Sequence, residues 1–184
     1  MLEFNFTPFP NLETQRLKLR RLKITDVKEI LALRSNPDIM KFIPRPLIKT
    51  EKEALEFITT MDTNIDTNKV INWAITTKEE DRLIGMIGYY RTKPEDFRSE
   101  VGYILSGDFH GKGIITESLE RVIQFGFEEM GLHSIEAVID PDNFASEKVL
   151  LKNNFVKEGH FKEHVFFEGK FLDSVFYSLL NKNH

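Results

Sequence analysis

From position 110 the sequence reads His110-Gly111-Lys112-Gly113-Ile114-Ile115-Thr116-Glu117, a two-glycine turn between an expected strand and a strongly patterned helix. Exposed backbone N–H groups at a helix start, helped by the helix dipole, bind anions, and glycines let the main chain approach a ligand closely. A pair of glycines is often only a turn. The Walker spacing is absent, and the Rossmann pattern needs a third glycine where Thr116 stands. The remaining interpretation is a short loop that cradles a pyrophosphate, with Lys112 adding charge and Thr116 a hydroxyl.

The segments on both sides of this turn predict a strand, helix, strand unit. Residues 100–105 and 134–139 have the composition of strands. Between them, apolar side chains recur at helical spacing over residues 116–130, and Gly131 is a natural helix end.

The rest of the chain predicts a mixed sheet flanked by helices. Strand-like composition, helical periodicity and a capping box at Thr50-Glu51-Lys52-Glu53 identify its elements. The expected strands are 17–22, 71–77, 83–90, one from Phe155 onward and 171–180, and the expected helices are 25–35, 50–61 and 145–153.

Composition limits the possible classes of protein. With 184 residues, 41% of them hydrophobic and 29% charged, the chain fits one domain over 1–184. Cysteine is absent, which excludes disulfides, thiolate metal sites and a cysteine nucleophile. The N-terminus has no basic signal region, and no apolar run approaches the roughly 20 residues that cross a bilayer, so we expect a cytoplasmic protein without a membrane partner. A net charge of -4 and the lack of a Lys/Arg cluster argue against nucleic acid as a partner.

Several motifs, taken in order, resemble the GNAT superfamily of acetyl-CoA-dependent N-acetyltransferases. The closest likeness is to the RimJ/RimL-like branch, which acetylates the N-termini of ribosomal proteins. The motifs are Glu100-Val101-Gly102-Tyr103-Ile104-Leu105, His110-Gly111-Lys112-Gly113 with Thr116-Glu117, Asn143-x-x-Ser146, Asn153-Asn154-Phe155, the opening Leu12-Glu13-Thr14-Gln15-Arg16-Leu17-Lys18-Leu19-Arg20, and the closing Asp173-Ser174-Val175-Phe176-Tyr177-Ser178-Leu179-Leu180.

The resemblance implies a mixed α/β fold with a mostly antiparallel central sheet of about seven strands and about four flanking helices. The fourth and fifth of these strands, 100–105 and 134–139, would splay apart and leave a V-shaped slot where acetyl-CoA and the amine meet. The pantetheine arm would pair with the first of these strands as an added strand does, and Asn143 would lie near the thioester. The cofactor-binding residues implied are Val101, Gly102, Tyr103 and Ile104 for pantetheine, and His110, Gly111, Lys112, Gly113, Ile114, Ile115 and Thr116 for the pyrophosphate.

The chain departs from the family pattern at four positions. His110 takes the first place of the phosphate motif and Ile115 its last, where a small residue is expected; the branched side chain would narrow the approach to phosphate and weaken CoA affinity. Leu150 stands where some relatives have a tyrosine that protonates the thiolate, and Val165 falls where this branch can have a glutamate. Glu163 is the nearest substitute for that glutamate.

Acetyl transfer needs a base for the amine, a donor for the tetrahedral oxyanion and an acid for the thiolate. A backbone N–H within 101–104 is the expected oxyanion donor. Glu100 is our candidate base, although a solvent-facing strand carboxylate is an equal alternative. Ser146, which relatives of this branch can use, is our candidate acid; helix capping by Asn143 and Ser146 is the alternative.

Two other groups of residues receive structural interpretations. His160 and His164, four apart on a strand, would lie roughly 13 Å apart, too far to chelate one metal ion. An acceptor pocket is possible for the aromatic residues, but core packing is the better expectation. They are Phe4, Phe6, Phe9, Phe166, Phe167, Phe171 and Phe176.

We therefore expect an enzyme that transfers acetyl from acetyl-CoA to a primary amine by direct attack in a ternary complex. The N-terminal amine of a ribosomal protein is the favoured acceptor, and residues 42–61 are expected to shape the acceptor side. The alternatives are a small-molecule amine such as a polyamine, an antibiotic or an amino acid, and a catalytically silent CoA-binding regulatory protein. Either a monomer or a homodimer fits, the latter through pairing of the apolar C-terminal strand.

Overall fold

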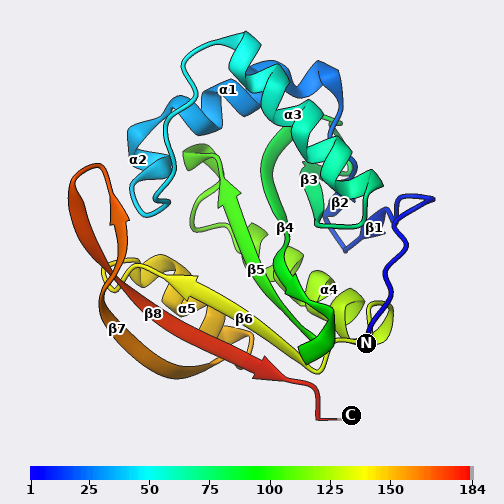
Figure 1. The fold of residues 1–184 in the computed structure, drawn as a ribbon. Coiled ribbons are helices and arrows are strands. Elements are labelled where there is room, and N and C mark those ends of the chain that lie inside the picture. The colour runs from blue at the N-terminus through cyan, green and yellow to red at the C-terminus, as the bar shows by residue number, and fades with distance from the viewer. Residues whose placement is uncertain (183–184) are drawn as a thin grey trace.

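The computed structural model describes residues 1–182, which form one eight-stranded mixed sheet with helices on both faces (Figure 1). The strand order is β1-β2-β3-β4-β5-β6-β8-β7. The strands are β1 Leu12–Glu13, β2 Leu17–Arg20, β3 Ile71–Thr77, β4 Leu83–Lys93, β5 Arg98–Leu105, β6 Ser134–Ile139, β7 Val156–Phe167 and β8 Lys170–Leu180. The helices are α1 Val27–Ser35, α2 Pro37–Met40, α3 Glu51–Asp66, α4 Ile114–Glu128 and α5 Phe144–Lys152, with short 3-10 turns η1 Ile24–Asp26, η2 Pro94–Asp96 and η3 Gly107–Phe109.

The α/β fold class is confirmed, and the differences from the expected elements are local. Over the described residues the sheet has eight strands, because the two-residue β1 pairs with β2. The additional helix is the single turn α2, which begins at a proline and is capped by Asn36. Prolines are favoured at a first helical position, so this Asn-Pro pair ends one helix and starts another.

The core of the sheet is β3 and the 83–89 part of β4, whose side chains are buried on both faces. On one face, Trp73 packs edge to face on Phe125 of α4 at 5.2 Å, and the Tyr89 hydroxyl donates to the Val122 carbonyl of α4 at 2.8 Å. On the other face α1 contacts β4 and α3 contacts β3. Figure 1 shows α1, α2 and α3 on the near side and α4 and α5 behind the sheet. Neighbouring residues of a strand therefore meet different helices.

The sheet opens between β5 and β6. These parallel strands pair only at Arg98↔Ser134, Ser99↔Ile135 and Glu100↔Glu136, whereas β5 follows β4 as far as Leu105. Beyond Glu100 the edge of β5 that faces β6 has no strand partner. The expected splay between these two strands is confirmed.

The C-terminal strand β8 lies inside the sheet, between β6 and β7. The expectation that it could pair with a second copy of the chain is therefore wrong, because both of its edges are already used. The edge strand at this end is β7, which carries the charged residues Lys157, Glu158, Lys162 and Glu163. Charges on an edge strand oppose pairing with another chain.

The expected core role of the aromatic residues holds in part. Phe6 is buried, and Phe4 and Phe9 pack against the core. Phe166 and Phe171 are each 63% exposed and contact each other at the turn between β7 and β8. For these two residues the prediction of core packing is wrong. Within the described residues no helix has the length and apolar character needed to span a bilayer.

Candidate active site

The two-glycine turn joins β5 to α4 and has the backbone shape that requires glycine. Gly111 and Gly113 have φ of 72° and 74°, in the left-handed region that other residues avoid. Gly113 is the N-cap of α4, and no side chain caps this helix. The helix therefore begins at Ile114, two residues earlier than expected, and the N–H groups of its first turn are open to an anion.

Hydrogen bonds to the connection between β1 and β2 hold the turn in place. One oxygen of Glu117 accepts from the Thr14 hydroxyl at 2.5 Å and from the Arg16 backbone N–H at 2.9 Å. The Arg16 Nε donates to the other oxygen at 2.6 Å, and its Nη1 donates to the Lys112 carbonyl at 3.1 Å. Burial disfavours the charged form of Glu117, but these hydrogen bonds outweigh it and hold its pKa below the ordinary value. We call Thr14, Arg16 and Glu117 the loop clamp.

The loop clamp joins residues about a hundred positions apart, and our sequence analysis did not predict it. Thr14 and Arg16 lie in the opening motif that resembles the family, and Glu117 follows the glycine turn. A carboxylate in the first turn of a helix ordinarily reads as a favourable partner of the helix dipole. No local pattern indicates that the opening motif is its partner.

The side chains of the turn contact neighbouring parts of the protein. Ile115 is only 8% exposed and belongs to the hydrophobic core. The expectation that it narrows the approach to phosphate is therefore wrong, because its branched side chain packs under the helix. The His110 ring lies 3.1 Å from the Leu105 carbonyl, and Lys112 Nζ lies 5.3 Å from the centre of the Phe109 ring. Both contacts hold the turn against the segment of residues 105–109 that precedes it.

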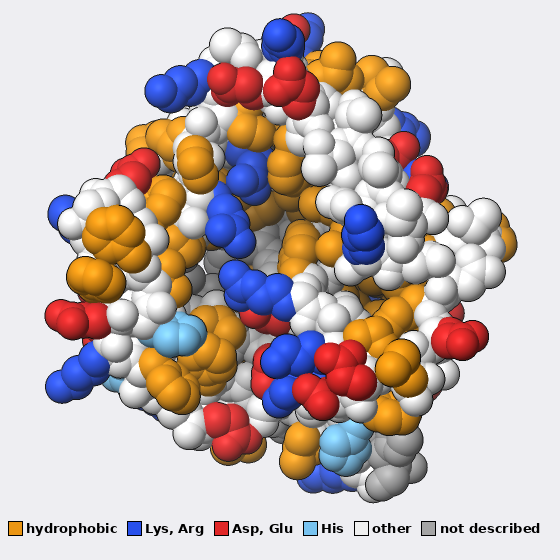
Figure 2. All heavy atoms as spheres, viewed as in Figure 1, with side chains coloured by type: hydrophobic (Ala, Val, Ile, Leu, Met, Phe, Trp, Pro, Cys, Tyr) orange, Lys and Arg blue, Asp and Glu red, His pale blue; other side chains and the backbone are white. Residues whose placement is uncertain are grey.

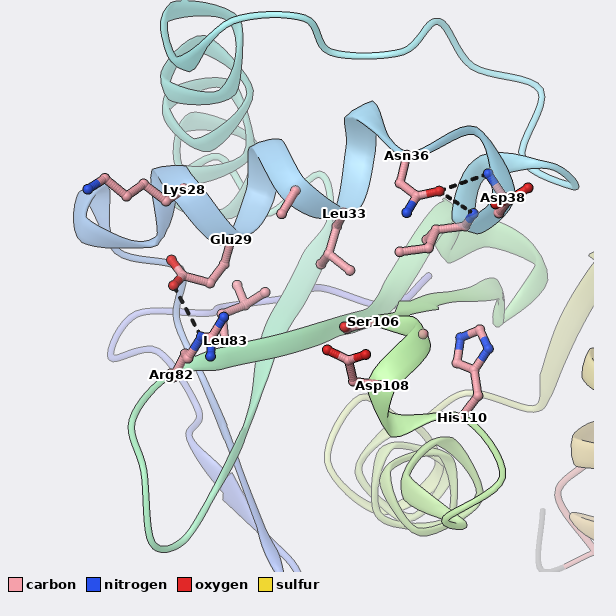
Figure 3. Close-up of a pocket in the computed structure, with 13 residues that line it drawn as sticks. Lys28, Glu29, Leu33, Asn36, Asp38, Arg82, Leu83, Ser106, Asp108 and His110 are labelled. Atoms are coloured by element: carbon pink, nitrogen blue, oxygen red, sulfur yellow. Dashed lines mark hydrogen bonds and ion pairs between the residues drawn. The ribbon is translucent and has the colours of Figure 1, made fainter.

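A cleft of about 720 Å³ lies between this turn and helices α1 and α2 (Figure 3). The 106–110 segment forms one wall, with His110 and Asp108 opposite α1 in the picture. The Arg82 to Glu29 ion pair of 3.4 Å borders it near the start of β4. Its size is ample for part of a small-molecule ligand.

The open edge of β5 separates two sets of side chains. Val101 and Tyr103 lie opposite Tyr89 and Ile87 of β4, on the face that α4 covers. Glu100 and Gly102 lie opposite Tyr90 and Gly88, on the face of α1 and α3. The strand predicted to meet the cofactor thus presents a different set of side chains to each side of the slot.

Glu100, the candidate base, lies beside Arg91 and Tyr90. One of its oxygens accepts from Arg91 Nη1 at 2.6 Å, and its side chain is 19% exposed. The Tyr90 hydroxyl accepts a hydrogen bond from Asn72 Nδ2. Burial is the main cause that raises the pKa of Tyr90 to about 12, so this phenol is neutral near pH 7.

Asn143 and Ser146 lie at the start of α5, where the capping interpretation holds. The Asn143 Oδ1 accepts from the Ser146 backbone N–H at 3.1 Å. The Tyr103 hydroxyl approaches the Ser146 carbonyl at 3.5 Å, and burial raises the pKa of this phenol to about 12. The structure thus brings β5 and the start of α5 together. Leu150, in the place where some relatives have a tyrosine, is fully buried.

The remaining candidates lie on the hairpin of β7 and β8. The Glu163 backbone N–H donates to Asp173 Oδ1 at 2.9 Å, and the His160 Nε2 lies 2.7 Å from Asp173 Oδ2. The His164 ring instead packs on Phe176 at 5.3 Å. The Glu163 side chain is exposed. The two histidines have different partners, and no metal-ligating cluster occurs among residues 1–182.

Figure 2 shows a hollow in the middle of the molecule, on the face that carries α1–α3. Hydrophobic side chains and several Lys or Arg side chains lie on its walls. A second molecule could therefore reach this face of the sheet without displacing a helix.

Comparison with known proteins agrees with this geometry. The family model described as "Acetyltransferase (GNAT) domain" matches residues 16–156. The uncharacterized N-acetyltransferase YoaA of Bacillus subtilis is 31% identical over 172 residues, with 94% of this chain and 97% of that protein covered. The solved structure of the ribosomal-protein-S5-alanine acetyltransferase from Vibrio fischeri is similar with a TM-score of 0.83 at 25% identity, covering 95% of this chain and 98% of the other.

A further solved structure shares the fold and contains the cofactor. It is a RimL ribosomal L7/L12 alpha-N-protein acetyltransferase in complex with coenzyme A, with a TM-score of 0.86 at 18% identity over 95% of this chain and all of that one. Two structural features agree with the family match. They are the separation of β5 from β6 and the start of α4, which follows two glycines and has no side-chain cap. The chain belongs to the GNAT family of acetyl-CoA-dependent N-acetyltransferases.

Proposed function

We propose that this N-acetyltransferase acts on the N-terminal amine of a protein, with a ribosomal protein as the favoured acceptor. The support is the similarity to proteins named for that activity, together with a hollow that is open to a large acceptor. A ribosomal acceptor would require the enzyme to work in the cytoplasm. The departures at Leu150 and Val165 favour the alternative of a silent CoA-binding protein, which the experiments below must exclude.

The parting of β5 and β6 is the observation that carries the cofactor assignment. Strand residues 101–104 have backbone groups without a strand partner, and the amides of pantetheine can pair with such an edge. The pyrophosphate then reaches residues 110–116, where the start of α4 offers free N–H groups and Lys112 a positive charge. Asn143 keeps its Nδ2 for the pantetheine or the thioester, because capping uses only its Oδ1.

The reaction proposed is direct attack within a complex of enzyme, acetyl-CoA and amine. The amine nitrogen forms a bond to the thioester carbon, and a backbone N–H of residues 101–104 stabilises the oxyanion. The intermediate collapses with cleavage of the carbon to sulfur bond. Glu100, directly or through a water molecule, takes the proton of the amine, and Ser146 gives a proton to the departing thiolate.

The positions of these two residues suit their separate roles. Glu100 lies on the face of α1 and α3, where the hollow admits an acceptor, and its Oε1 has no partner among residues 1–182. Ser146 lies on α5, next to Tyr103 on the opposite face. The amine would thus approach Glu100 from one side of β5, and the thiolate would leave toward Ser146 on the other side.

Replacement of Glu100 by Gln tests the base. We expect kcat to fall by about 10² or more, because general base catalysis contributes that much, with little change in CoA affinity. Thiol release from acetyl-CoA in the presence of N-terminal peptides and small amines measures it. A Glu79→Gln variant, in the exposed turn between β3 and β4, serves as the matched control. Full activity of Glu100→Gln would remove Glu100 as the base, and a wild-type protein that binds CoA but acetylates no amine would favour the silent alternative.

A further inference from the structure

Arg34, in the last turn of α1, is a cation without a counter-ion. Its Nε is buried and has no hydrogen-bond partner. Among the described residues every arginine except Arg34 and Arg45 forms an ion pair with a carboxylate. The Arg34 guanidinium instead stacks on the Phe57 ring of α3 at 4.6 Å. A partly buried charge is costly when unpaired, so its retention calls for an anion that the chain itself does not provide.

The two terminal nitrogens of Arg34 remain available to such an anion. Neither Nη atom has a partner among residues 1–182, and neither is sealed from solvent as Nε is. The Phe57 ring restricts the guanidinium plane, which leaves its end free to bind both oxygens of one carboxylate. Burial is the main cause that lowers the pKa of Arg34, and the positive charge of Arg45 lowers it further, so the two cations lie near each other.

The surroundings of Arg34 include further unused polar capacity. Arg34 lies near the Tyr90 phenol, which accepts its hydrogen bond from Asn72. Asn72 is fully buried, and its Oδ1 has no partner among the residues described. Polar atoms left unpaired in a core are unusual, and two of the five found among the described residues belong to this group.

This group of residues lies next to the candidate base. Tyr90 is paired directly with Glu100 across β4 and β5, on the face of α1 and α3. Figure 2 shows Lys and Arg side chains on the walls of the hollow on this same face. An acceptor whose amine approaches Glu100 would therefore pass Arg34.

We propose that Arg34, with Arg45 beside it, binds a carboxylate of the acceptor, so that the substrate is an amine that also carries a carboxylate. This inference rests on the acetyltransferase activity in the proposed function and limits its acceptor to amines that also carry a carboxylate. The carboxylate has two possible sources: an acidic side chain close to a peptide N-terminus, or the α-carboxylate of a free amino acid. In either case Arg34 is a specificity-determining residue that takes no part in proton transfer.

Paired acceptors test this proposal on the wild-type enzyme. The first pair is the C-terminally amidated peptides Ser-Asp-Ala-Ala and Ser-Asn-Ala-Ala, and the second is serine and serinamide. We expect KM to be about tenfold or more lower for the charged member of one pair, since hydrogen bonds to a charged partner contribute at least that much. The pair that shows the preference identifies the source of the carboxylate.

Variants then assign the preference to Arg34. In Arg34→Gln the KM for the charged acceptor should rise about tenfold or more, with kcat and the KM for the neutral acceptor little changed. Arg34→Lys should retain part of the preference, because it keeps the positive charge but loses the planar guanidinium that binds both oxygens of a carboxylate. Lys78→Gln is the control for removing a positive charge, since Lys78 pairs with Glu13 of the edge strand β1. Thermal unfolding midpoints show whether each variant is folded.

Equal KM values within both pairs, or an equal loss for charged and neutral acceptors in Arg34→Gln, would overturn the proposal while leaving the proposed function intact. If no amine is acetylated at all, the proposed function fails. Binding of the same acceptors to the CoA-loaded protein then decides the inference by calorimetry. A charged acceptor that binds the wild type at least tenfold more tightly than Arg34→Gln supports it, and equal affinities contradict it.

Discussion

At the scale of single residues, Ser146 is a hydroxyl whose local structural task is done by its backbone. Its backbone N–H, and not its side chain, forms the cap with Asn143. Ser146→Ala should therefore leave the free energy of unfolding nearly unchanged while kcat falls by about 10², the lower range for loss of a general acid. CoA affinity should stay as in the wild type. Steady-state kinetics and calorimetry check these values.

Asn143→Ala provides the contrast to Ser146→Ala. It removes the cap of α5 and should cost about 1 kcal/mol of stability. Equal turnover of Ser146→Ala and wild type would exclude the serine as the acid. The two variants together separate the capping role from the chemical role, which the sequence left as alternatives.

Gly113 illustrates a residue whose importance was expected for a different reason. The sequence indicates a close approach of the backbone to phosphate, but the structure adds a φ of 74° at the N-cap of α4. An added Cβ would have room, since the nearest atom to it is Arg16 Nη2 at 3.6 Å. Substitution at this position therefore strains the backbone as well as the ligand site, and it tests CoA binding less cleanly than a change in the loop clamp.

At the scale of elements, the loop clamp makes the phosphate turn depend on the opening strands. Glu117→Gln removes the charge that Thr14 and Arg16 bind, so we expect a loss of about 1 kcal/mol of stability after allowing for the half-exposed Arg16. The turn should loosen, and CoA should bind more weakly. Chemical denaturation and calorimetric titration measure the two effects. A variant with wild-type stability and CoA affinity would show that the turn holds its shape without the clamp.

The stability difference between wild type and Glu117→Gln should depend on pH. The folded-state pKa of Glu117 lies below its ordinary value of 4.5, so its contribution is fully present above 4.5. It is lost as the pH falls through the lowered value, because the folded carboxylate is then protonated. Unfolding midpoints of the two proteins should therefore converge in acid. A constant gap between pH 7 and strongly acidic conditions would contradict this assignment.

Periodicity predicted the elements well where one face or both faces are buried. The strand-like composition of β3 and the helical spacing of α4 are examples, with α4 displaced by only two residues. The limits of α4 were missed because the left-handed Gly113 starts the helix directly. The 3-10 turn η3 and the extended β4 depend on tertiary contacts that no local spacing encodes.

The site was predictable only in its local parts. The glycine turn, the strand of Glu100 and the cap of α5 are each written in consecutive residues. The loop clamp and the group around Arg34 join residues that are distant in the sequence. No local pattern therefore predicts that these residues meet. The buried direction of Ile115 also required the structure, since helical phase at a terminus is set by the cap.

At the scale of the whole molecule, CoA should stabilise the folded protein. A ligand at a hundredfold excess over its Kd adds about 2.7 kcal/mol. For a chain of this length that corresponds to a Tm increase of roughly 5–10 °C. Scanning calorimetry with and without CoA measures it, with adenosine as a control that lacks the pyrophosphate. An unchanged Tm at saturating CoA would contradict binding at the turn and the open strand edge.

The parting of β5 and β6 also has a mechanical meaning. Three residue pairs join the five-stranded part of the sheet, β1–β5, to the three-stranded part made of β6, β8 and β7. The ladder on one side of this junction can therefore transmit little strain to the other. A cofactor bound along the open edge would act as a splint, supplying amide contacts where the sheet has none. Helix α4 also joins the two parts, since it contacts both β4 and β6, and a bound cofactor would tie them together along the gap as well.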